Sequence, residues 1–336
     1  MYNSEIIGTG MFVPETVVTN HDLSKMMETS HDWIVQRSGI EERRWVTAEV
    51  STTDLALKAC EEAIKNAGID KKDIDCLMFA TLSPDHDFPG AACMLQPKLG
   101  LTEIPAIDVR QQCSGFLYGM SMADAFIKVG QYKIVLLVGA EVHSKGLDKT
   151  TRGRDVSVLF GDGAGAVVIR RKEVKDPAKD SHIMSTHLFA DGAFAKDLWL
   201  EGPGMANGAD RISHADLDAG KQYPQMNGKK VFANAVRRMA ECLMLALDTN
   251  KVKIDDIDLF LFHQANLRIN QMLAQELKIP DEKVFNTIQK YGNTTAATIP
   301  MGMADAVKAG KLKKGMLVAS AAFGSGFTWA SSVYRW

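Results

Sequence analysis

Short runs of apolar residues alternate along the chain with longer segments in which apolar positions recur every three or four residues. The apolar runs are 76–81, 104–109, 134–140, 166–169, 259–262 and 316–322, and the longer segments are 53–67, 115–129, 230–247 and 267–277. Runs of the first kind predict strands that are buried on both faces, and segments of the second kind predict amphipathic helices. Their alternation predicts an α/β fold with a largely parallel sheet in a layered arrangement.

The second half of the chain repeats the pattern of the first half. Segment 120–125 reads MSMADA and segment 301–306 reads MGMADA. Asp-Ile-Asp followed by four apolar residues occurs at 73–79 and again at 256–262, and the apolar run 134–139 has a counterpart at 315–320. The three matches occur in the same order at nearly one offset. They predict two duplicated halves, 1–172 and 173–336, related by a pseudo-twofold axis.

Segment 197–227 interrupts this alternation. It is poor in apolar residues and contains Gly202, Pro203, Gly204, Gly208, Gly220 and Pro224. We expect an irregular loop here. Long irregular loops in compact domains are often lids or binding loops, so this one is either a surface excursion or a cap over a substrate.

The composition is that of an ordinary globular protein, with 336 residues, 46% hydrophobic residues and a net charge of −2. That charge gives no overall attraction to nucleic acid or to an anionic membrane. No run approaches the roughly 20 apolar residues of a membrane span, and the N-terminus lacks a signal pattern, so we expect a cytoplasmic protein. The five cysteines form no Cys-x-x-Cys pair, and the histidines lack zinc-type spacing, so we expect no metal site.

One cysteine stands where chemistry is plausible. Cys113 lies between the apolar run 104–109 and the helical segment 115–129, with the small residues Ser114 and Gly115 after it. A thiol at a helix N-terminus is expected to have a lowered pKa, and small neighbours leave room for a substrate. The remaining cysteines lie within or beside helical and strand patterns and are expected to be inert; they are Cys60, Cys76, Cys93 and Cys242.

Two further polar residues occupy corresponding places in the second half. His263 follows the apolar run 259–262, and Asn293 precedes the repeated helix. If the halves face each other, both side chains can converge on Cys113. The alternatives are a structural histidine and a helix cap, and a cap is compatible with a catalytic amide. The glycine-rich turn 323–327 can supply a free N–H to an oxyanion, or it is only a turn.

Six segments in order carry a resemblance to a known family. They are Trp33–Ile40, Cys113–Phe116, Phe160–Ala166, His263–Arg268, Tyr291–Thr294 and Gly324–Trp329. With these segments the chain resembles, from end to end, a β-ketoacyl-acyl-carrier-protein synthase III of the thiolase superfamily. The resemblance implies a thiolase-like fold with five layers in the order αβαβα.

The resemblance also implies an acyltransferase that performs a decarboxylative Claisen condensation. Its nucleophile falls on Cys113, its His/Asn pair falls on His263 and Asn293, and its oxyanion hole falls on the backbone of Cys113 and Ser325. Acyl-CoA and a malonyl-acyl-carrier protein would be the substrates, with no cofactor and no metal. The product would be a β-ketoacyl thioester that initiates fatty-acid or related acyl-chain synthesis.

Binding residues are carried over in the same way. Trp33 and Arg152 would enclose the adenine of coenzyme A, and Arg37 and Arg268 would lie near its phosphates and the carrier-protein docking surface. The family implies a homodimer, in which Phe88 would cross the interface to close the partner's acyl pocket. Nucleic acid and membranes are not expected partners.

Some positions depart from the family pattern. Gln111-Gln112 and Ser325 replace smaller residues, segment 197–227 is longer, and Gln275 and Glu276 stand where basic residues would help a carrier protein to dock. A second basic surface is available at Lys229, Lys230, Arg237 and Arg238.

These departures leave other functions open: a synthase-III-like enzyme of secondary metabolism with an unusual donor or acceptor, an inactive partner subunit, or a Cys-His-Asn hydrolase. The acyl chain is also left open, because pocket depth depends on the packing of Phe88, Leu147, Leu159 and the 197–227 segment.

Overall fold

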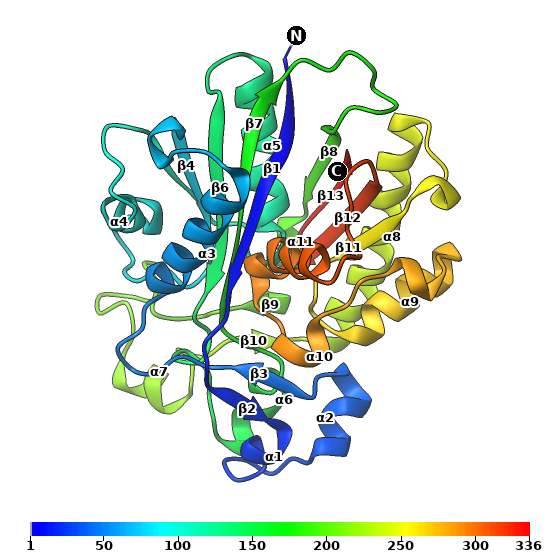
Figure 1. The fold of residues 1–336 in the computed structure, drawn as a ribbon. Helices are drawn as coiled ribbons and strands as arrows, with labels where there is room; N and C mark the ends of the chain where they lie inside the picture. The colour runs from blue at the N-terminus through cyan, green and yellow to red at the C-terminus, as the bar shows by residue number, and fades with distance from the viewer. Residues whose placement is uncertain (1) are drawn as a thin grey trace.

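The computed structural model describes residues 2–336 and contains two central β-sheets (Figure 1). The first sheet has the strand order β1-β7-β6-β4-β5. Its strands are β1 (Asn3–Phe12), β4 (Cys76–Ala80), β5 (Ala106–Val109), β6 (Ile134–Glu141) and β7 (Gly163–Lys172). The second sheet has the order β11-β12-β13-β8. Its strands are β8 (His182–Ala190), β11 (Leu259–Phe262), β12 (Leu317–Gly324) and β13 (Thr328–Arg335).

Helices cover both sheets and fill the space between them. The longer helices are α2 (His31–Ser38), α3 (Thr52–Ala67), α4 (Ala91–Lys98), α5 (Gly115–Lys128), α8 (Gly228–Asn250), α9 (Leu267–Leu277) and α11 (Thr298–Lys308). The short ones are α1 (Asn20–Leu23), α6 (Arg154–Ser157), α7 (His214–Asp218) and α10 (Ile288–Tyr291). Those predicted at 53–67, 115–129, 230–247 and 267–277 are α3, α5, α8 and α9.

The elements stack in five layers. α3 packs on β1, β6 and β7 at the outer face of the first sheet, and α8 packs on β12 and β13 at the outer face of the second. α5 and α11 lie between the sheets, where α5 contacts β6 and β8 and α11 contacts β7 and β11. The predicted αβαβα arrangement is confirmed.

The two halves correspond strand by strand. β1, β7, β6 and β4 of the first sheet match β8, β13, β12 and β11 of the second in order and in direction. The fifth strand, β5, has only a remnant in the second half, a single parallel bridge between Phe260 and Val284. The proposed boundary at 172/173 falls between the end of β7 and the start of β8.

The expectation of a largely parallel sheet is wrong. β4 pairs in parallel with β5 and β6, and β11 pairs in parallel with β12, but every other pair in the two large sheets is antiparallel. The chain turns straight back from β12 into β13 at residues 325–327, so no helix crosses over there. A buried antiparallel strand and a buried parallel strand give the same uninterrupted apolar run, so the sequence pattern could not separate them.

Segment 197–227 is more regular than expected. It contains the two-stranded sheet of β9 (Leu198–Trp199) and β10 (Gln225–Met226), with α7 between these strands. Between the two strands, Lys221 forms ion pairs with Glu201 at 3.0 Å and with Asp216 at 2.8 Å, which connect separate parts of the segment.

A small subdomain lies at the end of the molecule opposite the N-terminus (Figure 1). It contains α1, α2, α6 and the antiparallel pair β2 (Val17–Thr19) and β3 (Glu42–Arg44). Its apolar core includes Ile34, Ile40 and Phe160. Because α2 also contacts α9, the subdomain presents one face of α2 to the second half of the chain.

Across residues 2–336, every helix is too short or too polar to cross a bilayer.

Candidate active site

Cys113 lies in a tight turn between the two sheets. The turn is a 3₁₀ helix, Gln112–Ser114, that connects the end of β5 to α5. Gln112 has φ +43°, a left-handed conformation that is uncommon outside glycine and that turns the chain sharply before the cysteine. The end of β12 runs directly against this turn, since a Cβ atom built on Gly324 would lie 2.7 Å from the Cβ of Cys113. Only glycine fits at position 324 without movement of the nucleophile.

The second half of the chain contributes a matching turn. The 3₁₀ helix Thr295–Ala297 precedes α11, and its first residue, Thr295, has φ +49°. The two turns contact each other. Asn293 lies just before the second turn and His263 follows β11, so the pseudo-symmetry brings both residues toward Cys113.

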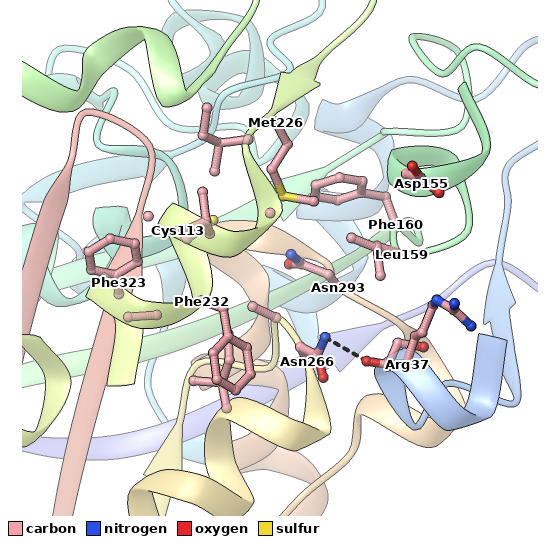
Figure 2. Close-up of a pocket in the computed structure, with 18 of the residues that line it drawn as sticks. Arg37, Cys113, Asp155, Leu159, Phe160, Met226, Phe232, Asn266, Asn293 and Phe323 are labelled. Carbon is pink, nitrogen blue, oxygen red and sulfur yellow. Dashed lines mark hydrogen bonds between the residues drawn. The ribbon is translucent and has the colours of Figure 1, made fainter. Parts of the chain in front are cut away.

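Cys113, His263 and Asn293 line one cavity of about 730 Å³. Figure 2 shows Cys113 on one side and Arg37 on the other, with Asn293 between them. The wall is mostly apolar and includes Leu159, Phe160, Leu198, Met226, Val231, Phe232, Met239 and Phe323. A cavity with a reactive group at one end and a cationic residue at the other suits an elongated ligand that has an apolar part and an anionic part.

His263 is 2% exposed, and burial lowers its pKa to about 3, so the ring is uncharged at neutral pH. Its Nδ1 lies 2.7 Å from the hydroxyl of Thr298, which donates its single hydrogen to the carbonyl of Thr295 at 3.1 Å. With this donation Nδ1 carries the ring hydrogen and Nε2 is an acceptor; when the hydroxyl donates to Nδ1 instead, the ring hydrogen lies on Nε2. Nε2 has no hydrogen-bond partner within the described chain.

Asn293 is held by its backbone and by its side chain. Its N–H donates to the Leu159 carbonyl at 2.8 Å, and its carbonyl accepts from Gly161 at 3.1 Å. Its Oδ1 accepts from the Thr295 N–H at 2.8 Å. That contact fixes the orientation of the amide and leaves the Nδ2 hydrogens for a ligand in the cavity.

The thiol of Cys113 does not have the lowered pKa that its place before a helix predicted. Burial and, to a smaller extent, the nearby Glu141 carboxylate raise the pKa of Cys113 to about 12. Hydrogen bonds from the Thr295 side chain and from the backbone N–H groups of Cys113 and Ser325 act in the opposite direction but do not prevail. The free enzyme therefore holds a thiol, because desolvation of a thiolate outweighs the helix dipole here.

The backbone N–H groups of Cys113 and Ser325 lie close enough to the sulfur to lower its pKa. The side chain of Ser325 points elsewhere, since its hydroxyl donates to the carbonyl of Leu198 on β9. A serine at this position thus leaves the backbone donor free, although a smaller residue was the family expectation.

The predicted coenzyme A residues are only partly brought together. Trp33 and Arg37 line the cavity, with the Arg37 guanidinium 4.2 Å from the centre of the Trp33 ring. The other guanidinium over Trp33 belongs to Arg154, at 4.7 Å, and not to Arg152. Arg152 lies in a separate cavity of about 270 Å³, where its Nε donates to Asp148 at 2.6 Å. Only Gly153 separates the two arginines in the sequence, so a motif alone could not tell which one faces Trp33.

The remaining predicted cations differ in how free their side chains are. Arg268 lies beside α2 and donates to the carbonyl of Gln36 at 3.2 Å. Lys229 lines the cavity, whereas Lys230 contacts Asp197 at 3.1 Å and Arg238 contacts Glu241 at 3.1 Å. Arg237 donates to Asn234 at 3.1 Å.

Several expected acyl-pocket residues lie outside the cavity. Phe88 is 84% exposed and does not line the cavity of its own chain. Leu147 is buried in the small subdomain, while Leu159 does line the cavity.

The two residues that depart from a basic carrier-docking surface, Gln275 and Glu276, are exposed on α9.

Sequence reasoning missed the residues that support the site from behind. Thr298 contacts His263, and Thr295 contacts Cys113 and Asn293. Both belong to the Asn-Thr-Thr-Ala-Ala-Thr segment, 293–298, whose pattern indicates only the start of a helix. Segment 228–239 gave a stronger signal: its positions 228, 231, 232, 235 and 239 share one helical face, and all of them line the cavity.

Two family models match the chain. A model described as 3-oxoacyl-[acyl-carrier-protein] synthase III matches residues 107–192, and its C-terminal counterpart matches residues 247–336. The chain is also 42% identical over 332 residues to a protein of Geobacillus kaustophilus named β-ketoacyl-[acyl-carrier-protein] synthase III. The match covers 98% of each chain.

Solved structures give the same picture. The crystal structure of 3-oxoacyl-[acyl-carrier-protein] synthase III from Aquifex aeolicus is similar with a TM-score of 0.88 and 40% identity, over 99% of this chain and 100% of that one. The priming β-ketosynthase of the R1128 polyketide biosynthetic pathway is similar with the same TM-score but 26% identity, over 99% of this chain and 96% of that one.

Proposed function

The chain belongs to the 3-oxoacyl-[acyl-carrier-protein] synthase III family, and from this we propose that it joins an acyl-CoA starter to a malonyl-acyl-carrier protein. It is then a condensing acyltransferase that initiates fatty-acid synthesis. The observation that carries this proposal is the cavity itself. It holds a thiol, an unpartnered imidazole nitrogen and a fixed carboxamide, and two backbone N–H groups lie close enough to the sulfur to lower its pKa.

In the first half-reaction the Cys113 sulfur attacks the thioester carbonyl of acyl-CoA. Since the resting group is a thiol, its proton must leave during the attack, and the free Nε2 of His263 is suited to accept it. The N–H groups of Cys113 and Ser325 stabilise the tetrahedral oxyanion, and one such donor typically contributes about 10²–10³ in rate. The carbon–sulfur bond to coenzyme A breaks, and its thiolate takes the proton from His263.

In the second half-reaction the malonyl thioester occupies the same cavity. His263 and Asn293 donate hydrogen bonds to its carbonyl as CO₂ leaves, and these bonds stabilise the enolate. The neutral ring needs its hydrogen on Nε2 for this step, which the Thr298 hydroxyl permits when it donates to Nδ1 instead. The enolate carbon attacks the acyl-Cys113 carbonyl and forms the new carbon–carbon bond. The bond from the acyl carbon to the sulfur breaks, and the released thiolate takes a proton from solvent to restore the resting thiol.

We also propose the roles of the outer residues. Trp33, Arg37 and Arg154 suit the nucleotide end of coenzyme A, since an indole stacks on adenine and guanidinium groups bind phosphates in a bidentate manner. Arg268 and Lys229 suit an anionic carrier protein at the cavity mouth. A homodimer would give the exposed Phe88 a partner.

A polyketide-type or other specialised starter enzyme is the second candidate. It rests on the similarity to the R1128 priming enzyme, but the identity of 26% is well below the 40–42% shared with the synthases of Aquifex aeolicus and Geobacillus kaustophilus.

Substitution can separate the proposed roles of His263 and Asn293. Asn293→Ala should lower condensation with malonyl-carrier protein by about 10²-fold or more and leave acylation of the protein by labelled acyl-CoA within a few-fold. His263→Ala should lower both, and condensation more strongly. Asn234→Ala, on α8 and outside the cavity, is the matched control. Equal loss of both steps in Asn293→Ala would contradict the assigned role.

A further inference from the structure

A second buried histidine lies beside the two catalytic turns and has no part in the mechanism above. His143 follows the end of β6, is 6% exposed and does not line the cavity. Its Nε2 lies 2.6 Å from the hydroxyl oxygen of Thr295. Its ring packs on Phe160, with 4.5 Å between the ring centres, and its backbone N–H donates to Asp162 at 2.7 Å. The ring is therefore held by two contacts, and the backbone of the residue by a third.

Thr295 connects this histidine to all three proposed catalytic residues. Its side chain lowers the pKa of the Cys113 thiol, and the turns that contain the two residues contact each other. Its N–H donates to Oδ1 of Asn293 at 2.8 Å. Its carbonyl accepts from Thr298, whose hydroxyl oxygen lies 2.7 Å from Nδ1 of His263. The first contact depends on the side chain, whereas the other two depend only on the backbone of Thr295.

The backbone of Thr295 is in a conformation that a β-branched residue rarely adopts. Its φ of +49° lies in the left-handed region, where the branched side chain is strained. Such strain persists where the surroundings over-determine a position, and it clusters at functional sites. A threonine at this position is unfavourable for the turn alone, so its hydroxyl calls for an explanation at the site.

We propose that Thr295 is a positioning residue for the nucleophile, and that His143 fixes the direction in which its hydroxyl donates. A hydroxyl has one hydrogen and accepts at its oxygen. When Nε2–H of His143 donates to that oxygen, the hydroxyl hydrogen is left for the Cys113 sulfur. The hydrogen bond then strengthens as negative charge develops on the sulfur, both during attack on the acyl-CoA and when the sulfur leaves. This inference rests on the proposed function, because the direction matters only for a reacting sulfur.

The charges around His143, Thr295 and Cys113 agree with a hydroxyl that donates toward the sulfur. Burial lowers the pKa of His143 to about 3, so the ring is neutral and acts through its N–H. Burial and the carboxylate of Glu141 raise the pKa of the Cys113 thiol, and Thr295 is the side chain that opposes them. The neutral His263 faces the same cavity, and Asp162 binds the backbone of His143 and not its ring.

The test is the rate at which iodoacetamide alkylates Cys113 between pH 7 and 9. All variants carry Cys93→Ser, because Cys93 is the one exposed cysteine among the described residues and would react as well. Thr295→Val removes the hydroxyl and keeps both backbone contacts. It should alkylate about tenfold more slowly at each pH, which corresponds to a rise of about one pKa unit. Thr295→Ser should restore the rate to within about twofold.

His143 is tested by the same measurement. His143→Leu should slow alkylation in the same direction as Thr295→Val, and His143→Gln, which keeps a donor near the position of Nε2, should recover most of the rate. Thr186→Val is the matched control. Thr186 lies on β8, outside the cavity, and its hydroxyl donates to the Ser121 hydroxyl at 2.7 Å. Thermal melts establish that each variant is folded.

Two results would overturn the inference. One is a Thr295→Val protein with the unchanged alkylation rate, and the other is a Thr295→Ser protein as slow as Thr295→Val, which would point to disruption of the turn. If either occurs while the protein still transfers acyl groups from acyl-CoA to malonyl-carrier protein, the proposed function stands. Only the proposed roles of Thr295 and His143 are then wrong.

Discussion

Burial without a charged partner decides the proton states of the single residues in this site. It raises the pKa of the Cys113 thiol to about 12 and lowers those of His263 and His143 to about 3. Thiol and imidazole are therefore both uncharged at rest, unlike a preformed thiolate–imidazolium pair. The sulfur becomes a strong nucleophile only when a bound thioester provides an acceptor and the two N–H groups stabilise the oxyanion.

Glu141 gives the protein a pH dependence of its own. Its carboxylate is fully buried at the end of β6 and accepts from Thr81, Leu82 and Ser83, but burial prevails and raises its pKa to about 7. Between the ordinary value near 4.5 and 7, the unfolded chain releases this proton while the folded protein keeps it. Stability must therefore fall as the pH rises through this window and level off above it.

Replacement of Glu141 tests that statement. In Glu141→Gln the decline of about 3 kcal/mol between pH 4.5 and 7 should be absent, so the difference between the unfolding free energies of variant and parent, measured with urea, should change by that amount across the window. The variant should also be less stable overall, because an amide nitrogen would face donors. Glu276→Gln, at an exposed position of α9, should keep the slope of the parent. An unchanged slope in Glu141→Gln would assign the titration to another group.

At the residue scale, motifs predicted the cavity-facing residues and missed those behind them. Cys113, His263 and Asn293 stand at the ends of recognisable strands and helices. His143 and Thr295 stand in no pattern, because a buried histidine bonded to a hydroxyl is indistinguishable in sequence from any other buried polar residue. The choice between Arg152 and Arg154 depends on the direction of one turn of 3₁₀ helix, which spacing does not encode.

At the scale of elements, the 197–227 segment forms one wall of the cavity. β9 contributes Leu198 and β10 contributes Met226, while Lys221 ties the part between them together. Arg211 also binds Asp87, the neighbour of Phe88, at 2.5 Å. The abundance of glycine and proline predicted a loop correctly in outline but could not predict the ion pairs that order it.

The segment should therefore influence the choice of acyl chain. Met226→Ala enlarges the cavity and should raise the rate of acylation by long-chain acyl-CoA relative to short-chain acyl-CoA by about tenfold, which is within the range for a change of a few methylene groups. Met205→Ala is the matched control, since Met205 belongs to the same segment but is 83% exposed. Rates across a series of acyl-CoA lengths are the measurement. Equal ratios in both variants would exclude Met226 from the acyl site.

At the scale of the whole molecule, duplication explains why the site lies where it does. Equivalent turns before α5 and α11 meet between the sheets, and each contributes polar groups that the other lacks. The repeat was visible in the sequence because buried helices between two sheets tolerate little change. The strand directions and the loss of the fifth strand in the second half were not, since both depend on tertiary packing.

The first sheet ends in an open edge. β5 pairs only with β4 in the part of the chain that the structure describes, and an unpaired edge strand beside an exposed aromatic residue is a usual site of association. We expect a particle of twice 36.8 kDa by light scattering. Phe88→Ala should lower the acylation rate, because the side chain would close the partner's cavity. Val129→Ala, another exposed apolar position, should not lower it. A particle of the mass of one chain would contradict the proposed role of Phe88.

The central claim is that an acyl group passes through Cys113 to malonyl-carrier protein, and mass spectrometry of the Cys113 peptide tests it most directly. After incubation with acyl-CoA, this peptide should gain the mass of the acyl group. Addition of malonyl-carrier protein should then remove that mass as a β-ketoacyl carrier protein forms. The account would be contradicted if the acyl group were found on another residue or on none, or if it left only as the free acid.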